Sequence, residues 1–151
     1  MRLRAEGRRV VIADDAQEIL DLLSMVLEQR GYTVYVFTDG ASALAQIPEI
    51  SPDLVILDII MPGADGLVIC EAVKSSPATK SIPVFLMTSA TAGSEVSDGF
   101  WKIGTRADAF FSKPFNPLEV AAYVDKFVMG TELPADLARR QTGGGAARVT
   151  R

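Results

Sequence analysis

Two kinds of hydrophobic segment alternate along most of the chain. Short runs rich in β-branched and aromatic residues are typical of strands, and the apolar residues between them recur at helical spacing. The predicted strands cover residues 9–13, 33–37, 54–57, 84–88 and 109–112. Strands that alternate with helices predict an α/β protein with a parallel sheet. Because the strands are apolar throughout, helices should cover both faces of that sheet.

Helical spacing and capping residues locate the helices. The first helix has one apolar face and ends at Gly31, and the last, with its body at 118–129, has Asn116 as N-cap, Pro117 in its first position and Glu119 in a capping box. The apolar face of the first helix consists of Ile19, Leu22, Leu23, Val26 and Leu27. Three more helices are expected near residues 41–47, 65–75 and 94–103.

The composition is that of one globular domain: 151 residues, 48% hydrophobic and 23% charged. The N-terminus lacks the apolar run of a signal peptide, and no apolar stretch could span a bilayer, so we expect a cytoplasmic protein without membrane contact. The chain has no histidine, which excludes Ser-His-Asp and Cys-His catalysis and argues against zinc. Its single cysteine, Cys70, is predicted to be a buried structural thiol.

Charge divides the chain into three parts. Residues 1–9 carry a net charge of +3 and residues 130–151 one of +2, so residues 10–129 carry −9. We expect a basic extension at 1–8, a folded domain at 9–129 and a flexible basic tail beyond, in which "ADLARR" adds at most a helical turn. The basic ends could contact an acidic partner, but solvated tails are the simpler interpretation. The acidic body predicts no direct binding of nucleic acid.

Polar side chains gather at the ends of the predicted strands. In open α/β folds ligands bind at the edge where the carboxyl ends of the strands meet. Asp14 and Asp15 follow the first strand, Asp58 the third, Thr88 and Ser89 the fourth, and Lys113 the fifth. Clustered carboxylates repel one another, and an all-oxygen set with room for water suits Mg²⁺. With the cation of Lys113, such a site is suited to phosphoryl transfer onto a carboxylate.

Four motifs resemble those of the response-regulator receiver domain, the CheY-like phosphoacceptor module of two-component signalling. They are "IADDAQE", "LVILDIIMPGADG", "VFLMTSA" and "FFSKPFNPLEV", and the resemblance covers roughly residues 9–129. It implies a flavodoxin-like (βα)5 fold, a doubly wound sheet of five parallel strands in the order 2-1-3-4-5.

The resemblance also implies a role for each site residue. Asp58 accepts a phosphoryl group from the phosphohistidine of a histidine kinase. Asp15 ligates Mg²⁺ directly, Asp14 acts largely through water, and the backbone carbonyl of Ile60 completes the protein ligands together with Asp58.

Phosphate binding and switching fall on the fourth and fifth strands. Thr88, Lys113 and the backbone of Ser89 contact the phosphoryl group, and Lys113 is followed by a cis peptide to Pro114. Phe110 is the switch aromatic, without the hydroxyl of the tyrosine often found there.

The resemblance implies that the face formed by the fourth helix, fifth strand and fifth helix makes the protein-protein contacts that phosphorylation switches. An exposed Trp101 beside Lys102 would fit a partner contact there, whereas packing of both Phe100 and Trp101 is the alternative. The expected partners are a sensor histidine kinase or phosphotransfer protein, an unidentified downstream protein and a second copy in a homodimer, with no nucleic acid and no membrane. The protein would be a signalling phosphoacceptor rather than an enzyme, as a stand-alone receiver or a fragment of a longer regulator.

Two departures from the family pattern predict a long-lived phosphorylated state. The residues two positions after Asp58 and Thr88 are Ile60 and Ala90, and neither offers a polar group to orient an attacking water.

Other interpretations stay open at this stage. Asp14 and Asp15 could cap the first helix, Lys113 could be a surface lysine, and Thr88 and Phe110 could be ordinary strand residues. A phosphohydrolase of the haloacid dehalogenase type also forms an aspartyl phosphate, but its nucleophile lies on the first strand in an Asp-x-Asp motif. A degenerate receiver that only binds partners would lack the acids or the lysine, which are present here.

Overall fold

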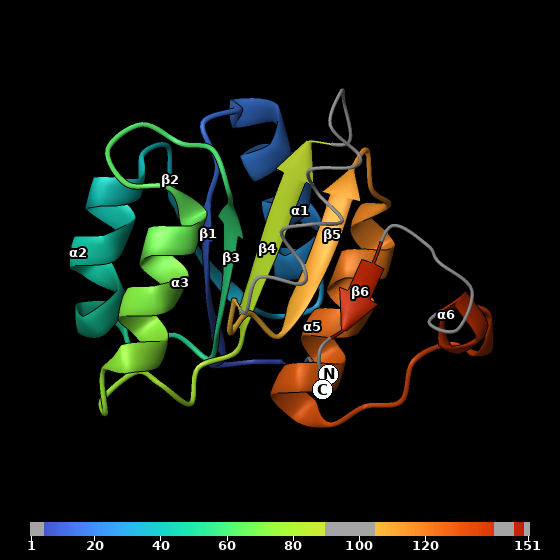
Figure 1. Ribbon diagram of the computed structural model, residues 1–151. Coiled ribbons are helices and arrows are strands. Elements are labelled where there is room, and N and C mark those ends of the chain that lie inside the picture. Colours follow the sequence, from blue (N-terminus) through green and yellow to red (C-terminus); the bar gives the residue numbers. More distant parts are fainter. Residues whose placement is uncertain (1–4, 90–104, 141–146, 150–151) are drawn as a thin grey trace.

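The computed structural model describes residues 5–89, 105–140 and 147–149, in which strands and helices alternate from the first strand to the fourth (Figure 1). The strands are β1 (Arg9–Ala13), β2 (Thr33–Phe37), β3 (Leu54–Asp58), β4 (Val84–Ser89), β5 (Ala109–Lys113) and β6 (Ala147–Val149). The helices are α1 (Gln17–Gln29), α2 (Gly40–Ile50), α3 (Gly66–Ser75), α5 (Pro117–Met129) and α6 (Ala135–Arg140).

A single sheet in the order β2-β1-β3-β4-β5-β6 organises the molecule. The first five strands are parallel, and β6 pairs antiparallel with β5. The order 2-1-3-4-5 of the parallel strands confirms the predicted flavodoxin-like, doubly wound fold.

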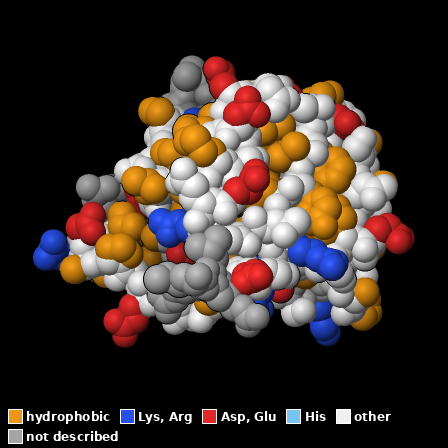
Figure 2. All heavy atoms as spheres, turned by 180° about the vertical axis from the view of Figure 1, so that it is seen from behind, with side chains coloured by type: hydrophobic (Ala, Val, Ile, Leu, Met, Phe, Trp, Pro, Cys, Tyr) orange, Lys and Arg blue, Asp and Glu red, His pale blue; other side chains and the backbone are white. Residues whose placement is uncertain are grey.

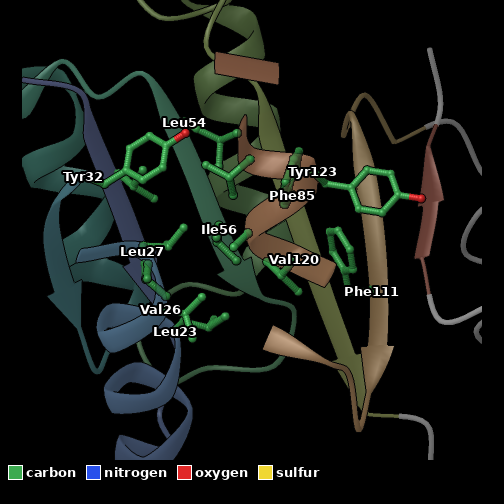
Figure 3. Close-up of a cluster of buried hydrophobic side chains, with 14 of the residues drawn as sticks. Leu23, Val26, Leu27, Tyr32, Leu54, Ile56, Phe85, Phe111, Val120 and Tyr123 are labelled. Carbon is green, nitrogen blue, oxygen red and sulfur yellow. The ribbon is translucent and has the colours of Figure 1, made fainter. Parts of the chain in front are cut away.

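Helices cover both faces of the sheet, as the apolar strands predicted. In Figure 1, α2 and α3 lie in front of the strands, and α1 and α5 lie behind them. Successive residues of β1 point to opposite faces, so Val10 and Ile12 join one core cluster while Val11 and Ala13 join the other. Figure 3 shows the cluster on the α1 and α5 side, where Phe85 and Phe111 pack with ring centroids 5.4 Å apart.

The face behind the sheet keeps some apolar residues exposed. Figure 2 shows hydrophobic side chains there, lying between charged ones. Leu22 and Met25 of α1 and Leu118 of α5 belong to the exposed set. No helix within the described ranges is long and apolar enough to cross a membrane.

The buried face of α1 differs from the prediction at two positions. Leu22 is 38% exposed, whereas Leu20, which the pattern left out, is fully buried. Leu20, Leu23 and Leu27 form the centre of the stripe that faces the sheet, and Leu22 falls beyond the edge of this stripe.

The other described helices lie near their predicted positions. α2 continues through Pro48 to Ile50, beyond the expected end, and the amide of Ser51 still bonds to the carbonyl of Ile47 at 2.9 Å. In α5, the side chain of the N-cap Asn116 accepts a hydrogen bond from the amide of Leu118 at 2.9 Å. The helix expected at 94–103 lies outside the described residues.

The segment after Gly130, which we predicted to be a flexible tail with at most a helical turn at "ADLARR", contains that turn as α6 and the strand β6. Leu137 of α6 is buried, and β6 pairs Ala147, Arg148 and Val149 with Phe111, Phe110 and Ala109 of β5. Neither contact shows in the local composition, because each depends on a surface supplied by the folded domain.

Cys70 is buried, as predicted. It lies in α3, within the core cluster on the α2 and α3 side of the sheet. Burial raises the pKa of its thiol above the ordinary value.

Candidate functional site

Three carboxylates meet at the carboxyl edge of the sheet. Asp14 and Asp15 follow β1 directly, and Asp58 is the last residue of β3. One ligand oxygen from each lies within 4.8 Å of the others, so the three together could hold a metal ion. Asp14 is fully buried and Asp58 nearly so, whereas Asp15 is exposed. The chemistry of this donor set suits Mg²⁺, which prefers hard oxygen ligands and keeps some of its water.

Lys113, at the end of β5, joins two of these carboxylates. Its Nζ lies 2.8 Å from Oδ2 of Asp14 and 3.3 Å from Oδ1 of Asp58. Burial alone would lower the pKa of Lys113, but the hydrogen bond to Asp14 and the charge of Asp58 raise it above its ordinary value. Lys113 therefore keeps its positive charge at every pH at which the carboxylates are ionised.

Asp58 is held in an environment that disfavours its charge. Burial and the nearby charge of Asp14 raise its pKa to about 6, although Lys113 acts in the opposite direction. A second cation near Asp58 would relieve this repulsion. The electrostatics thus favour a bound divalent cation.

Asp14 is fixed by the backbone around it. Its Oδ1 accepts a hydrogen bond from the amide of Ala16 at 2.9 Å, and its own amide donates to the carbonyl of Phe37 at 3.1 Å. The N-cap of α1 is Ala16, which has no side-chain cap. The alternative that Asp14 and Asp15 serve as helix caps is therefore wrong.

The loop after Asp58 exposes the large apolar side chain of Ile60 to solvent. Ile60 is 75% exposed, whereas its neighbours Ile59 and Met61 are buried. The amide of Gly66 donates to the carbonyl of Ile59 at 2.8 Å and so closes the loop at the start of α3. The side chain of Ile60 therefore points away from the core, in the loop that follows Asp58.

The remaining predicted residues lie on β4 and β5 or outside the described chain. Thr88 is half-buried and pairs with Ser112, and Ser89 pairs with Lys113. Phe110 is buried in the core on the α2 and α3 side. The peptide between Lys113 and Pro114 is cis, as predicted. Ala90, Trp101 and Lys102 lie outside the described residues.

Sequence reasoning missed how the N-terminus of α2 supports the site. The amide of Gly40 donates to the carbonyl of Pro62, in the loop after Asp58, at 2.9 Å. The dipeptide Asp39-Gly40 signals a turn, but the contact joins segments far apart in the chain.

Comparison with known proteins identifies the family of this chain. The family model described as "Response regulator receiver domain" matches residues 10–125. Regulatory protein VanRc of Enterococcus gallinarum is 37% identical over 118 residues, which are 78% of this chain and 48% of that protein. The DNA-binding response regulator MtrA of Mycobacterium tuberculosis H37Rv is 32% identical over 117 residues, 78% of this chain and 49% of that protein. The chain thus spans about half the length of these relatives.

Solved structures agree with this comparison. A protein from Chloroflexus aurantiacus, described as a response regulator, has a TM-score of 0.69 and 32% identity, covering 82% of this chain and 98% of that one. The chemotaxis response regulator CheY4 of Vibrio cholerae has a TM-score of 0.68 and 28% identity, with 80% and 98% coverage.

The relatives correct one prediction, that the protein has no nucleic-acid partner. MtrA, and RpaA of Synechocystis at 33% identity, are both named as DNA-binding regulators. The prediction rested on the acidic charge of residues 10–129, but about half of each relative lies outside the segment that it shares with this chain. The charge of the shared segment therefore cannot exclude a DNA partner.

The matched residues include Asp14, Asp15, Asp58 and Lys113, and they account for most of the chain. The chain belongs to the response regulator receiver domain family.

Proposed function

We propose that this chain is the phosphoacceptor of a two-component system and receives a phosphoryl group on Asp58. The donor is the phosphohistidine of a sensor histidine kinase or of a phosphotransfer protein. The observation that carries the proposal is the cluster of Asp14, Asp15 and Asp58 with Lys113 bridging two of the acids. Phosphoryl transfer onto a carboxylate requires that this nucleophile has positive charge close to it.

The transfer moves the phosphoryl group from nitrogen to oxygen. A carboxylate oxygen of Asp58 forms a bond to phosphorus while the bond from phosphorus to the donor's imidazole nitrogen breaks, and the imidazole takes up a proton. Lys113 neutralises charge on the transferred group, and Thr88 with the backbone of Ser89 binds its oxygens. Mg²⁺, held by the three aspartates and the carbonyl of Ile60, would neutralise further charge on the phosphoryl oxygens.

The proposed consequence is a shift between two conformations rather than turnover of a substrate. Lys113 ends β5, and Phe110 lies three residues before it, so a rearrangement around the phosphoryl group reaches the β5 face. The protein then acts by changing its contacts with a partner and catalyses only its own phosphorylation and dephosphorylation. A cytoplasmic location would suit this role.

Intact-mass measurement tests the proposal. The chain is incubated with Mg²⁺ and phosphoramidate, and we expect the addition of one phosphoryl group. Asp58→Asn should abolish the gain, whereas Asp136→Asn, which changes an exposed carboxylate of α6, should leave it unchanged. A wild-type chain without the gain, or a gain that survives Asp58→Asn, contradicts the proposal.

A further inference from the structure

The first turn of α2 lies directly against the loop that follows Asp58. The amide of Gly40 donates to the carbonyl of Pro62 at 2.9 Å. A Cβ atom built on Gly40 would lie 1.7 Å from the carbonyl oxygen of Ala64, a separation that no unbonded atoms adopt. The contact therefore exists only because residue 40 has no side chain.

A second glycine meets α2 from the loop side. Gly63 has a φ of +88°, and a Cβ atom on it would lie 3.0 Å from both the Cβ and the amide nitrogen of Ala41. Gly40 and Gly63 thus let two backbones approach each other more closely than residues with side chains allow.

The segment that carries Gly40 is itself fixed. The side chain of Asp39 caps α2 by accepting a hydrogen bond from the amide of Ser42 at 2.8 Å. Two residues earlier, the carbonyl of Phe37 accepts from the amide of Asp14 at 3.1 Å. Residues 37–42 therefore connect one wall of the acidic site, at Asp14, to the loop that forms another wall.

The other end of the loop is equally restricted. A Cβ atom on Gly66 would lie 2.4 Å from the carbonyl oxygen of Asp58. The loop can thus move neither away from α2 nor away from the start of α3 without losing a backbone hydrogen bond. A displacement at Gly40 has to be taken up by the backbone between Asp58 and Gly66.

We infer that Gly40 is a positioning residue for divalent-cation binding and phosphoryl acceptance at Asp58, although it lies on another element and touches neither group. Its missing side chain sets where α2 holds the backbone of residues 59–64, which includes the proposed carbonyl ligand of Ile60. The inference rests on the proposed function. It predicts that Gly40→Ala weakens Mg²⁺ binding by pushing this loop away.

Calorimetric titration of the full chain with Mg²⁺ tests the inference. We expect Gly40→Ala to bind Mg²⁺ about tenfold more weakly than the wild type, the lower end of the range for residues that support metal ligands, and to be phosphorylated more slowly by phosphoramidate. The matched control is Gly130→Ala at the C-cap of α5. Gly130 has a φ of +73°, and apart from its immediate neighbours in the sequence no residue of the described chain has an atom within 4 Å of its added Cβ. The control should lower the unfolding temperature without changing Mg²⁺ affinity.

The outcomes separate this inference from the proposed function. Mg²⁺ affinity of Gly40→Ala within twofold of the wild type overturns the inference alone. If Gly40→Ala fails to fold, Gly63→Ala tests the same contact from the loop, and unchanged Mg²⁺ affinity in that variant overturns the inference. A wild-type chain that binds no Mg²⁺ overturns the proposed function and this inference with it.

Discussion

The carboxylate of Asp58 lies in an environment where its charged form destabilises the folded protein. Its pKa of about 6 exceeds the ordinary value of 3.8 because of burial and the charge of Asp14. Between these two values the unfolded chain loses the proton first, so rising pH favours unfolding in this window. Asp58, the proposed phosphoacceptor, therefore lowers the stability of the unmodified protein when its carboxylate is ionised.

We expect Asp58→Asn to stabilise the protein in the presence of EDTA. The gain in the free energy of unfolding should be small near pH 4, grow up to about pH 6 and reach about 2 kcal/mol at pH 7. Denaturant unfolding at several pH values measures it. Equal stability of the two proteins at pH 7 would show that the charge of Asp58 is compensated.

We predict that the side chain of Ile60 affects the lifetime of the phosphorylated protein. We expect Ile60→Glu to shorten the lifetime of the phosphorylated protein several-fold, because a carboxylate there can orient a water toward the phosphoryl group. Its 75% exposure means that the substitution should leave the unfolding temperature unchanged. Decay of the phosphorylated mass in Mg²⁺ gives the lifetime, and a wild-type lifetime of seconds would contradict the prediction.

At the scale of elements, local signals predicted most of what the structure contains. The N-cap of α5 was predicted correctly because Asn116 acts on a neighbouring amide. The buried face of α1 was partly wrong because the orientation of a helix toward its sheet depends on packing, which decides between Leu20 and Leu22. The contact of Gly40 with the loop after Asp58 could not be predicted, since it joins two segments through their backbones.

One buried ion pair joins α3 to the starts of β4 and β5. Oδ2 of Asp108 accepts from Nζ of Lys74 and from the amide of Val84, both at 2.8 Å. We expect Asp108→Ala to lower the free energy of unfolding by about 3 kcal/mol, because it leaves the Lys74 charge without its carboxylate. Glu71→Ala, which breaks the exposed pair with Arg106, should lower it far less because that pair is open to water. Denaturant unfolding compares the two, and similar losses would contradict the prediction.

The strand β6 makes a limited contact with the edge of β5. Three residue pairs form within the described part of the chain, so we expect truncation after Arg140 to lower stability by about 1 kcal/mol or less. The clearer effect should be faster hydrogen exchange at Ala109–Phe111, whose outer edge then faces water. Exchange rates in β5 that are unaffected by truncation would contradict the pairing.

At the scale of the whole molecule, the sequence predicted the parallel sheet and the edge at which Asp14, Asp58 and Lys113 meet. Both follow from the order of strands and helices, which local patterns of the sequence indicate. Partners were harder to predict, because the charge of residues 10–129 carries no information about the other half of the longer relatives. After Gly130, the helical turn at "ADLARR" corresponds to α6, whereas the pairing of β6 was not predicted because it depends on the edge of β5.

The single cysteine of this chain has a buried thiol, which can report local opening of the folded protein. Cys70 lies on the α2 and α3 side of a sheet that separates two cores, so a thiol reagent can reach it only when that side opens. The rate of labelling under native conditions measures the free energy of this opening, without any introduced probe. Because α2 also supports the loop after Asp58, slower labelling on addition of Mg²⁺ would reveal that filling the acidic site stiffens this half of the protein.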